Sequence, residues 1–600
     1  MQWIVGLDAL RALAMFFIVA YHFLHSSGIL TGGFIFIEFF LVVSGYLMTA
    51  KLLREYGKNG QVSILRFISG RILRLWPAML LTMLLMLALA YLTPHELLAG
   101  LRPDSLAAAL FSTNIVEIIS GNGYENTISP NLFKHFWFVG LELQLCILLP
   151  IVLTLTIMSA GSRKSALRRS LAVTVALSLV SVGLMVAYGG LWRQGDRAYF
   201  APDVQAFGFF MGASLALWRQ LHPLKARRRR FGASLRLILS FVALFILSIL
   251  LRYDETRAYC WGMPAAALLS VVALASLLRL QRRRTTMPRV FRPLEFLGKF
   301  SFGVYLIHYP LMILLQRVVN IGLPLRMVLV IVLSLLLAVS VVGLLEALAR
   351  RQIPAMIMVS LLLIPAVMTL VASPKESPIM QEISQNKVDS SDLTIRYVQN
   401  PDNTGLEKAL SEAKQHAEEA SERANAEAET ASNEPAANAN NAKVLVIGDS
   451  VTLGAKMDME NLIPGVFVDA EESRGVEKAV PILNQVAAGG NIPQVIVVSL
   501  TTNERYFSDE LMQGIVDAAR GGRVIFVTGY AGPEQPRESQ NEAIKAFANS
   551  HDGVYYADWW QLAHDNWDLL YADHIHLNPE GRSAYAQLIY NTIMNTGGIQ

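Results

Sequence analysis

The chain has 600 residues, of which 53% are hydrophobic and only 16% are charged. Soluble proteins carry about 25% charged residues, so a large part of this chain belongs in a bilayer. The formal net charge is only +4, and we expect no nucleic-acid partner. The two cysteines, Cys146 and Cys260, exclude a disulfide framework, and we expect no metal site.

Eleven apolar segments follow one another over residues 1–372, and each approaches the roughly 20 residues that a helix needs to cross a bilayer. We place them near 3–24, 34–50, 75–93, 136–157, 170–189, 202–219, 236–252, 261–279, 303–320, 325–347 and 353–372. Alternate loops, beginning with 51–74, hold 26 Lys and Arg residues, and the other loops hold 8. Because basic short loops stay in the cytoplasm, this pattern predicts a cell-membrane protein with a cytoplasmic amino terminus and an extracytoplasmic carboxyl terminus.

Polar residues recur inside the apolar segments, where ionisable groups are costly and are functional candidates by default. In GLDALRALAMFFIVAYHF, Arg11 and His22 are about three helical turns apart and share one helix face. Four further motifs follow: FIEFFLVVSGYLMT with Glu38, RILRLWPA with Arg71 and Arg74, HFWFVGLELQLCILLP with Trp137 and Glu142, and FLGKFSFGVYLIHYPL with Ser301, Tyr305 and His308.

These five motifs, in this order, resemble the acyltransferase-3 family of integral membrane proteins over about residues 1–350. The resemblance implies a membrane domain of ten spans, to which residues 351–372 add an eleventh helix. It also implies acetyl-CoA as the acyl donor, carbohydrate hydroxyls as acceptors, and no permanently bound cofactor.

The predicted topology places His22, Glu38, His135 and Glu142 toward the outer half of the membrane, where a histidine is suited to activate an acceptor or relay an acyl group. Arg71 and Arg74 fall at the cytoplasmic side, and arginines there suit the phosphates of coenzyme A.

Two alternatives are simpler. In the first alternative, Arg71 and Arg74 have no ligand and serve only to keep their loop in the cytoplasm. In the second, Asp8 and Arg11, which are three residues apart, only neutralise each other.

Residues 373–441 are polar and rich in Ala and Glu, with few large apolar side chains. Such a composition cannot bury a core. We therefore expect an extracytoplasmic linker that is partly helical or disordered.

Residues 442–600 show a different pattern, in which short β-branched runs alternate with helical segments. KVLVIG, QVIVVSL, RVIFVTG and GVYYAD predict buried parallel strands, and the alternation predicts an α/β sandwich of three layers. Polar clusters follow the strands, where such a fold places its ligands: Gly448-Asp449-Ser450, Thr502-Asn503 and Asp573-His574-Ile575-His576.

These clusters resemble the SGNH hydrolase superfamily. The resemblance implies that Ser450 is the nucleophile, with His576 as its base and Asp573 as the acid that orients the imidazole. Asn503 and the backbone N–H of Ser450 would stabilise the oxyanion.

A further oxyanion donor is expected in DAEESRG (469–475), with Ser473 as the candidate. His574 and His564 compete with His576 for the role of base. A domain that only binds its ligand is a further alternative.

The order of the parts resembles that of bacterial peptidoglycan O-acetyltransferases. The resemblance implies that acetyl groups pass from cytoplasmic acetyl-CoA, through acetylated Ser450, to the 6-hydroxyl of N-acetylmuramoyl residues, which hinders lysozyme. Three alternatives stay open: an O-acetyltransferase for O-antigen, exopolysaccharide or teichoic acid, an SGNH acetylesterase, and a transporter or channel with a carbohydrate-binding tail. The sequence does not fix the oligomeric state.

Overall fold

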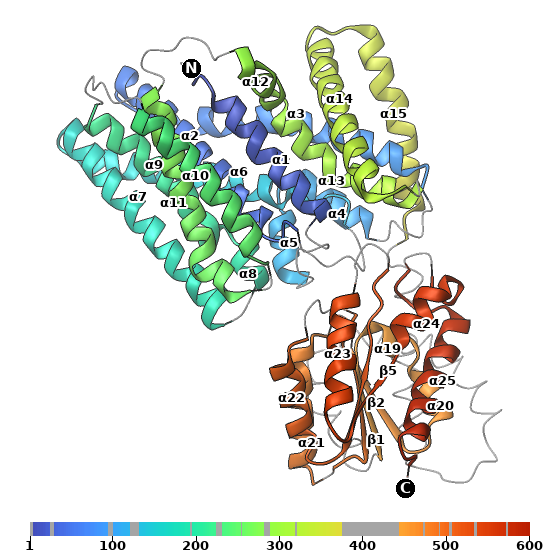
Figure 1. Cartoon of the computed structure of the whole chain (residues 1–600). Helices are drawn as coiled ribbons and strands as arrows, with labels where there is room; N and C mark the ends of the chain where they lie inside the picture. The colour runs from blue at the N-terminus through green and yellow to red at the C-terminus, as the bar shows by residue number, and fades with distance from the viewer. Residues whose placement is uncertain are drawn as a thin grey trace, which may run out of the picture. The chain divides into compact units, whose positions relative to one another are not determined.

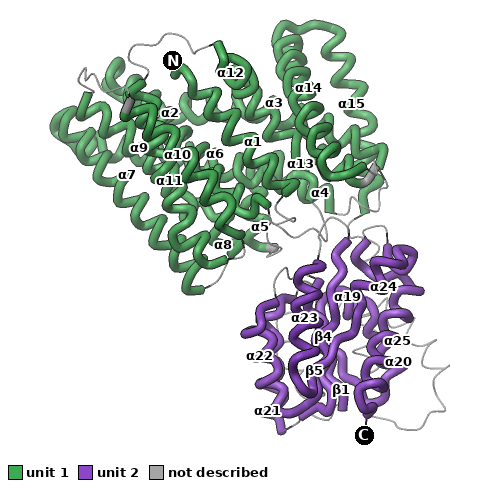
Figure 2. Tube along the Cα trace, viewed as in Figure 1, with its two compact units in different colours: residues 1–375 green, residues 376–600 purple. Residues whose placement is uncertain are grey.

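A computed structural model of the chain is drawn in Figure 1 and divides into two compact units, residues 1–375 and 376–600 (Figure 2). The expected linker, residues 373–441, lies outside the described residues from 375 onward. The structure describes residues 4–24, 29–93, 100–120, 131–192, 195–223, 231–253, 255–280, 289–318, 321–374, 443–471, 474–490, 492–502, 507–532, 537–571 and 574–599.

The first unit consists of helices, as Figure 1 shows from blue to yellow. Three short turns, η1 (Gly33–Phe36), η3 (Lys134–Phe136) and η7 (Arg289–Phe291), lead directly into helices. Where the structure describes them, the α-helices are α1 (Leu7–Leu24), α2 (Ile37–Asn59), α3 (Ile64–Ala90), α4 (Leu101–Ala109), α5 (Thr113–Ser120), α6 (Trp137–Met158), α7 (Arg163–Val186), α8 (Gly195–Phe200), α9 (Pro202–Leu221), α10 (Phe231–Leu250), α11 (Met263–Leu280), α12 (Arg292–Lys299), α13 (Ser301–Val318), α14 (Leu323–Ala349) and α15 (Ile353–Ala372).

Among the described residues, ten helical segments are long and apolar enough to cross a membrane, and the bent pair α12–α13 makes an eleventh if it is one span. The two helices of that pair meet at an angle of 61°. Helices suit this setting because each one satisfies its own backbone hydrogen bonds without water. The prediction of about eleven membrane helices is confirmed.

Several helices extend beyond the predicted spans. α3 begins at Ile64 rather than at residue 75, so Arg71 and Arg74 lie inside a helix instead of in a loop. The predicted loop 94–135 contains α4 and α5, which are only 9 and 8 residues long. Helices of this length are too short to register as membrane spans, which is why hydropathy missed them.

Close backbone contact joins α2 to α9. A Cβ atom added to Gly45 would lie 1.9 Å from the carbonyl oxygen of Phe209, and one added to Gly212 would lie 2.0 Å from that of Val42. Small residues allow membrane helices to approach in this way. The packing of these two helices therefore depends on both glycines.

Where the structure describes the second unit, it contains one parallel sheet of five strands, in the order β2-β1-β3-β4-β5. The strands are β1 (Val444–Gly448), β2 (Val466–Ala470), β3 (Val495–Ser499), β4 (Arg523–Val527) and β5 (Val554–Ala557). All four predicted strands are present. The sequence analysis missed β2 because it is an edge strand with only its central residue, Val468, fully buried.

Helices cover both faces of this sheet. α19 (Ser450–Gly454), α20 (Lys456–Leu462), α24 (Trp559–Asp565) and α25 (Pro579–Asn595) pack on the face that Val444 and Val446 present. α21 (Ala479–Ala488), α22 (Asp509–Ala518) and α23 (Glu538–Ser550) pack on the opposite face with Leu445 and Ile447 (Figure 1). The predicted α/β sandwich of three layers is confirmed.

The strand order reverses at β1, which has β2 on one side and β3 on the other. In an open parallel sheet, ligands bind beyond the carboxyl ends of the strands at such a reversal. The fold therefore directs attention to the residues that follow β1 and β3.

We predict that Gly212→Ala destabilises the first unit, because the new methyl group would overlap the Val42 carbonyl. Forcing an extra carbon into a packed interface costs about 1–3 kcal/mol, which thermal unfolding in detergent would detect as a lower melting temperature. Gly183→Ala in α7 is the matched control, because nothing lies within 4 Å of its added Cβ. Equal melting temperatures for the two variants would contradict the close α2–α9 contact.

Candidate active site

A tight turn from strand to helix presents Ser450. β1 ends at Gly448 and α19 begins at Ser450. Between them, the side chain of Asp449 caps the helix by accepting a hydrogen bond of 3.0 Å from the N–H of Val451. A Cβ at Gly448 would lie 2.2 Å from Thr452, so only glycine fits the turn.

His576 lies against this serine. Its Nε2 is 3.1 Å from the Oγ of Ser450, and both side chains are buried. A backbone hydrogen bond holds the histidine in place, since the carbonyl of His576 accepts from the N–H of Tyr571 over 2.8 Å. A serine hydroxyl that donates to an imidazole is the arrangement of an activated nucleophile.

The two competing histidines lie elsewhere. His564 is exposed and contacts Asp565, with its Nδ1 3.2 Å from a carboxylate oxygen. The ring of His574 packs against Trp567, with the ring centres 4.8 Å apart. The geometry therefore favours His576 as the base.

Three predicted site residues, Ser473, Asn503 and Asp573, lie outside the described residues, so their roles stay predictions. Next to Asn503, the carbonyl of Thr502 accepts a 2.9 Å hydrogen bond from Arg537, whose side chain is buried. Ser450 is the first residue of α19, and the first N–H groups of a helix have no partner within it.

Asp449 brings a carboxyl group close to His576. Burial raises the pKa of Asp449 to about 6, although the N–H of Val451, the charge of His576 and the hydroxyl of Thr502 oppose the rise. The sequence analysis assigned this residue no role. Its carboxyl group interacts electrostatically with His576.

A cluster of buried hydroxyl groups lies next to the turn that presents Ser450. The hydroxyl of Tyr585 lies 2.5 Å from the Oγ of Ser499 at the end of β3 and 3.3 Å from the Oγ1 of Thr452. These contacts tie α25 to the end of β3 and to α19, the helix that follows β1. Tyr585 is far from Ser499 and Thr452 in the sequence, so no local sequence pattern predicts these contacts.

In the first unit, a salt bridge connects two of the predicted residues. Nη2 of Arg71 donates to Oε1 of Glu142 over 2.6 Å, and the hydroxyl of Ser44 donates to the same oxygen. Arg71 and Glu142 therefore share one depth in the membrane, and their predicted placement in opposite halves is wrong. Buried charges need partners, and the early start of α3 makes this pairing possible.

Arg11 and Arg74 belong to the same region, because Arg11 lies near enough to both Glu142 and Arg74 to interact with them electrostatically. Nη1 of Arg11 also contacts Asp8 at 3.4 Å, so the mutual neutralisation considered above takes place. The cluster carries a net positive charge, which suits an anionic ligand.

Two further histidines meet between α1 and α13. The Nδ1 of His22 lies 3.2 Å from the Nε2 of His308. A third imidazole, His135, lies beside them with its ring centre 5.6 Å from that of His308, and the hydroxyl of Tyr305 donates to its carbonyl. The structure thus gathers His22, Tyr305 and His308, together with His135.

Pro310 explains part of this arrangement. A proline inside a helix has no N–H to donate to the carbonyl four residues earlier, which here belongs to Leu306. The Nε2 of His135 lies 3.1 Å from that carbonyl oxygen and takes the place of the missing donor.

Glu38, Trp137 and Ser301 are all buried but do not join these clusters. Among the described residues, the two carboxyl oxygens of Glu38 have no hydrogen-bond partner, and the hydroxyl of Ser301 has none either. Trp137 packs against Tyr199, with ring centres 4.6 Å apart.

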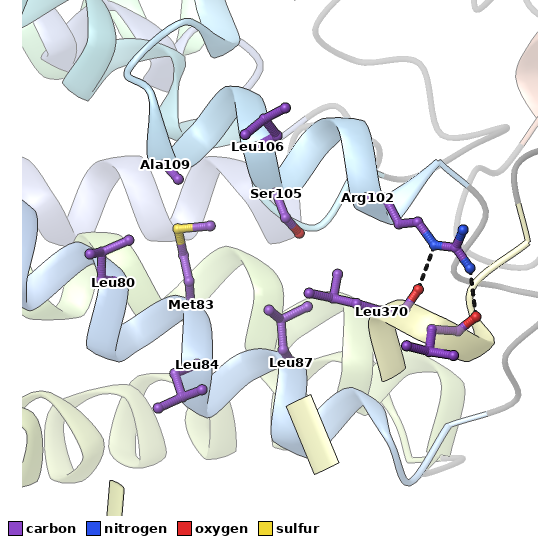
Figure 3. Close-up of a pocket in the computed structure, with 10 residues that line it drawn as sticks. Leu80, Met83, Leu84, Leu87, Arg102, Ser105, Leu106, Ala109 and Leu370 are labelled. Atoms are coloured by element: carbon purple, nitrogen blue, oxygen red, sulfur yellow. Dashed lines mark hydrogen bonds between the residues drawn. The ribbon is translucent and has the colours of Figure 1, made fainter. Parts of the chain in front are cut away.

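An apolar groove of about 670 Å³ lies between α3, α4 and α15 (Figure 3). Leu80, Met83 and Leu87 contribute to its walls, and Arg102 at its end donates to the carbonyls of Leu370 and Val371 over 2.6 and 2.5 Å. None of the predicted site residues lines it. Its aliphatic walls match hydrocarbon rather than a polar substrate.

Comparison with known proteins identifies the family. A family model described as an acyltransferase domain matches residues 4–343, more than half of the chain. The chain therefore belongs to the acyltransferase family, as the five membrane motifs predicted. It is a multi-pass membrane protein and an enzyme that transfers acyl groups.

Two relatives align with nearly the whole chain. The O-acetyltransferase OatA of Staphylococcus aureus is 26% identical over 617 residues, which cover 99% of this chain and 96% of the relative. The putative peptidoglycan O-acetyltransferase YrhL of Bacillus subtilis is 25% identical over 635 residues, or 98% of each chain. A solved C-terminal catalytic domain, from the Streptococcus pneumoniae peptidoglycan O-acetyltransferase A, matches 26% of this chain and 94% of itself at 23% identity and a TM-score of 0.25.

We predict that Asp449→Asn removes a pH-dependent loss of stability. Between pH 4 and 6 the native carboxyl, with its pKa raised from 3.8 to about 6, binds more protons than the unfolded one, so its contribution to stability falls as the pH rises. The stability of the variant relative to the wild type should therefore rise by about 2 kcal/mol between pH 4 and pH 7.

Urea unfolding of a fragment covering residues 443–600 measures this difference. Asp552→Asn, at an exposed position, controls for the loss of one negative charge. Parallel stability curves for Asp449→Asn and the wild type would show that the buried carboxyl does not titrate in this range.

Proposed function

We propose that this protein is an O-acetyltransferase that moves acetyl groups from cytoplasmic acetyl-CoA across the membrane to the 6-hydroxyl of N-acetylmuramoyl residues in peptidoglycan. The main support for the proposal is the hydrogen bond between Ser450 and His576, because it gives the chain a candidate nucleophile outside its acyltransferase domain. Both full-length relatives are named O-acetyltransferases, and one is named for peptidoglycan.

The first half of the outer reaction acetylates Ser450. As its Oγ attacks the carbonyl carbon of the acetyl group on its carrier, His576 Nε2 takes the hydroxyl proton. The tetrahedral intermediate then collapses, and the carrier leaves with that proton. The N–H of Ser450 and the side chain of Asn503 would stabilise the oxyanion.

The second half transfers the acetyl group to the sugar. The sugar hydroxyl gives its proton to His576 and attacks the acetyl-serine, and Ser450 leaves as a hydroxyl by taking that proton back. Asp573 would hold the imidazole in position, and ionised Asp449 supports its positive charge. Transfer exceeds hydrolysis because the acceptor excludes water from a buried site.

In the membrane unit, the positive cluster around Arg71 would bind the phosphates of coenzyme A. Arg11 and Arg74 lie in the same region, and guanidinium groups bind phosphate in a bidentate manner. The thiolate of coenzyme A would leave on the cytoplasmic side after the acetyl group has passed to a carrier hydroxyl.

We predict that Ser450→Ala abolishes glycan acetylation. Inside-out vesicles loaded with peptidoglycan fragments and supplied externally with labelled acetyl-CoA should label Ser450 and the muramoyl hydroxyls in the wild type. The variant should lose glycan label by at least about 1,000-fold, since the nucleophile is gone. Ser583→Ala, at an exposed position away from the site, is the matched control.

Several outcomes decide between the alternatives. Glycan label that survives Ser450→Ala overturns the role of this serine. Label on a different surface polymer changes the acceptor. Deletion of the protein should lower the ester-linked acetate on purified wall glycan, whereas an esterase predicts an increase.

We also predict that the carboxyl terminus is outside the cell, because eleven spans separate it from a cytoplasmic amino terminus. External protease should remove a carboxyl-terminal tag from intact cells stripped of their wall. An amino-terminal tag on the same cells is the control and should stay protected. Protection of the carboxyl-terminal tag would remove the need for transfer across the membrane.

A further inference from the structure

The contact between His22 and His308 fixes where protons reside. His308 is fully buried on α13, and His22 is 8% exposed near the end of α1. Their facing nitrogens, Nδ1 of His22 and Nε2 of His308, are 3.2 Å apart. One of these nitrogens must donate and the other must accept.

The contacts of the other ring nitrogen of His308, Nδ1, show which of the two facing nitrogens donates. Its Nδ1 lies 2.7 Å from the carbonyl oxygen of Tyr305 and 3.0 Å from that of Val304. A carbonyl oxygen only accepts hydrogen bonds, so this Nδ1 carries a proton. A second proton on the ring would create a charge on a fully buried side chain within a membrane helix, which is costly.

His308 is therefore neutral, and its Nε2 holds the lone pair. It accepts a hydrogen bond from the Nδ1–H of His22. Because a neutral imidazole has one donor and one acceptor nitrogen, the lone pair of His22 is on its Nε2. The carbonyls of α13 thus determine the tautomer of a histidine on α1.

We propose that His308 is a positioning residue that holds His22 in the tautomer whose Nε2 is the base for acyl transfer inside the membrane unit. The inference rests on the proposed function. As the carrier hydroxyl attacks the thioester carbonyl of acetyl-CoA, His22 Nε2 takes its proton. Coenzyme A leaves as the thiolate and then receives that proton, which returns His22 to its neutral form.

The arrangement parallels a catalytic triad, in which a carboxylate orients the histidine. Here a neutral imidazole does so, and it suits a membrane because it adds no buried charge. α13 is itself held in place by His135, which donates to the Leu306 carbonyl beside Pro310. The carbonyls of Val304 and Tyr305 anchor His308 to its own helix, and its Nε2 points at His22 on α1.

Two amide substitutions separate this role from a structural one. The amide of glutamine reaches the place of Nε2, whereas that of asparagine reaches only the place of Nδ1. His308→Gln keeps an acceptor for His22, and His308→Asn keeps only the donor to the carbonyls of α13.

The test uses the full chain reconstituted in proteoliposomes, with transfer of label from acetyl-CoA to Ser450 as the readout. We expect His308→Gln to stay within about tenfold of the wild type and His308→Asn to fall by at least about 100-fold, as expected when a general base is misplaced. His22→Gln and His22→Asn should both fall to background, because neither supplies a base. His222→Gln, at an exposed position after α9, is the control.

Each outcome is decisive when the variants elute from size exclusion as the wild type does. The inference is wrong if His308→Asn is as active as His308→Gln or more active. It is also wrong if both variants are inactive or if both are fully active. If the wild type moves no label from acetyl-CoA, the proposed function fails and the inference fails with it. If the wild type labels Ser450 but His308→Asn is at least as active as His308→Gln, the inference about His308 is wrong while the proposed function stands.

Discussion

A bilayer offers no hydrogen-bond partner, so a polar side chain within it is stabilised when it finds a partner in the protein. In the first unit this constraint pairs Arg71 with Glu142 and gives His308 two carbonyls of its own helix. It also explains why His135 lies beside the carbonyl that Pro310 leaves without a helical donor. Several motif residues are thus one another's partners, and their contacts join α2, α3 and α6 at Glu142 and join α1 to α13 through the two histidines.

The second unit places its reactive group by a different means. Its site follows from strand order, because reversal at β1 brings the ends of β1 and β3 together. Gly448 permits the sharp turn that aims Ser450 at His576, and Tyr585 ties α25 to the end of β3 and to α19. Both units therefore hold a histidine in a fixed orientation, the first through contacts between helices and the second through the topology of a sheet.

Some of this could be read from the sequence. Membrane helices must be long and apolar, and buried parallel strands must be continuously apolar, so both left clear patterns, whereas the half-exposed strand β2 did not. Ordered motifs led to Ser450 and His576, which the fold brings within 3.1 Å. The pairs Arg71–Glu142 and His22–His308 join residues 71 and 286 positions apart. Loop charge gives the side of the membrane but not the depth of a residue, so neither pair was foreseeable.

Burial of the serine bears directly on the choice between transfer and hydrolysis. Ser450 and His576 are 1% and 3% exposed, so an acetyl group on Ser450 would meet little water before an acceptor enters. A hydrolase with the same two residues needs an open path for water, whereas a transferase needs an acceptor that completes the walls of the site. In the proposed reaction, acetyl passes from a thioester to a carrier ester, then to a serine ester and finally to a sugar ester. The last step is an exchange between esters and needs no further source of energy, which leaves exclusion of water as the main demand on the outer site.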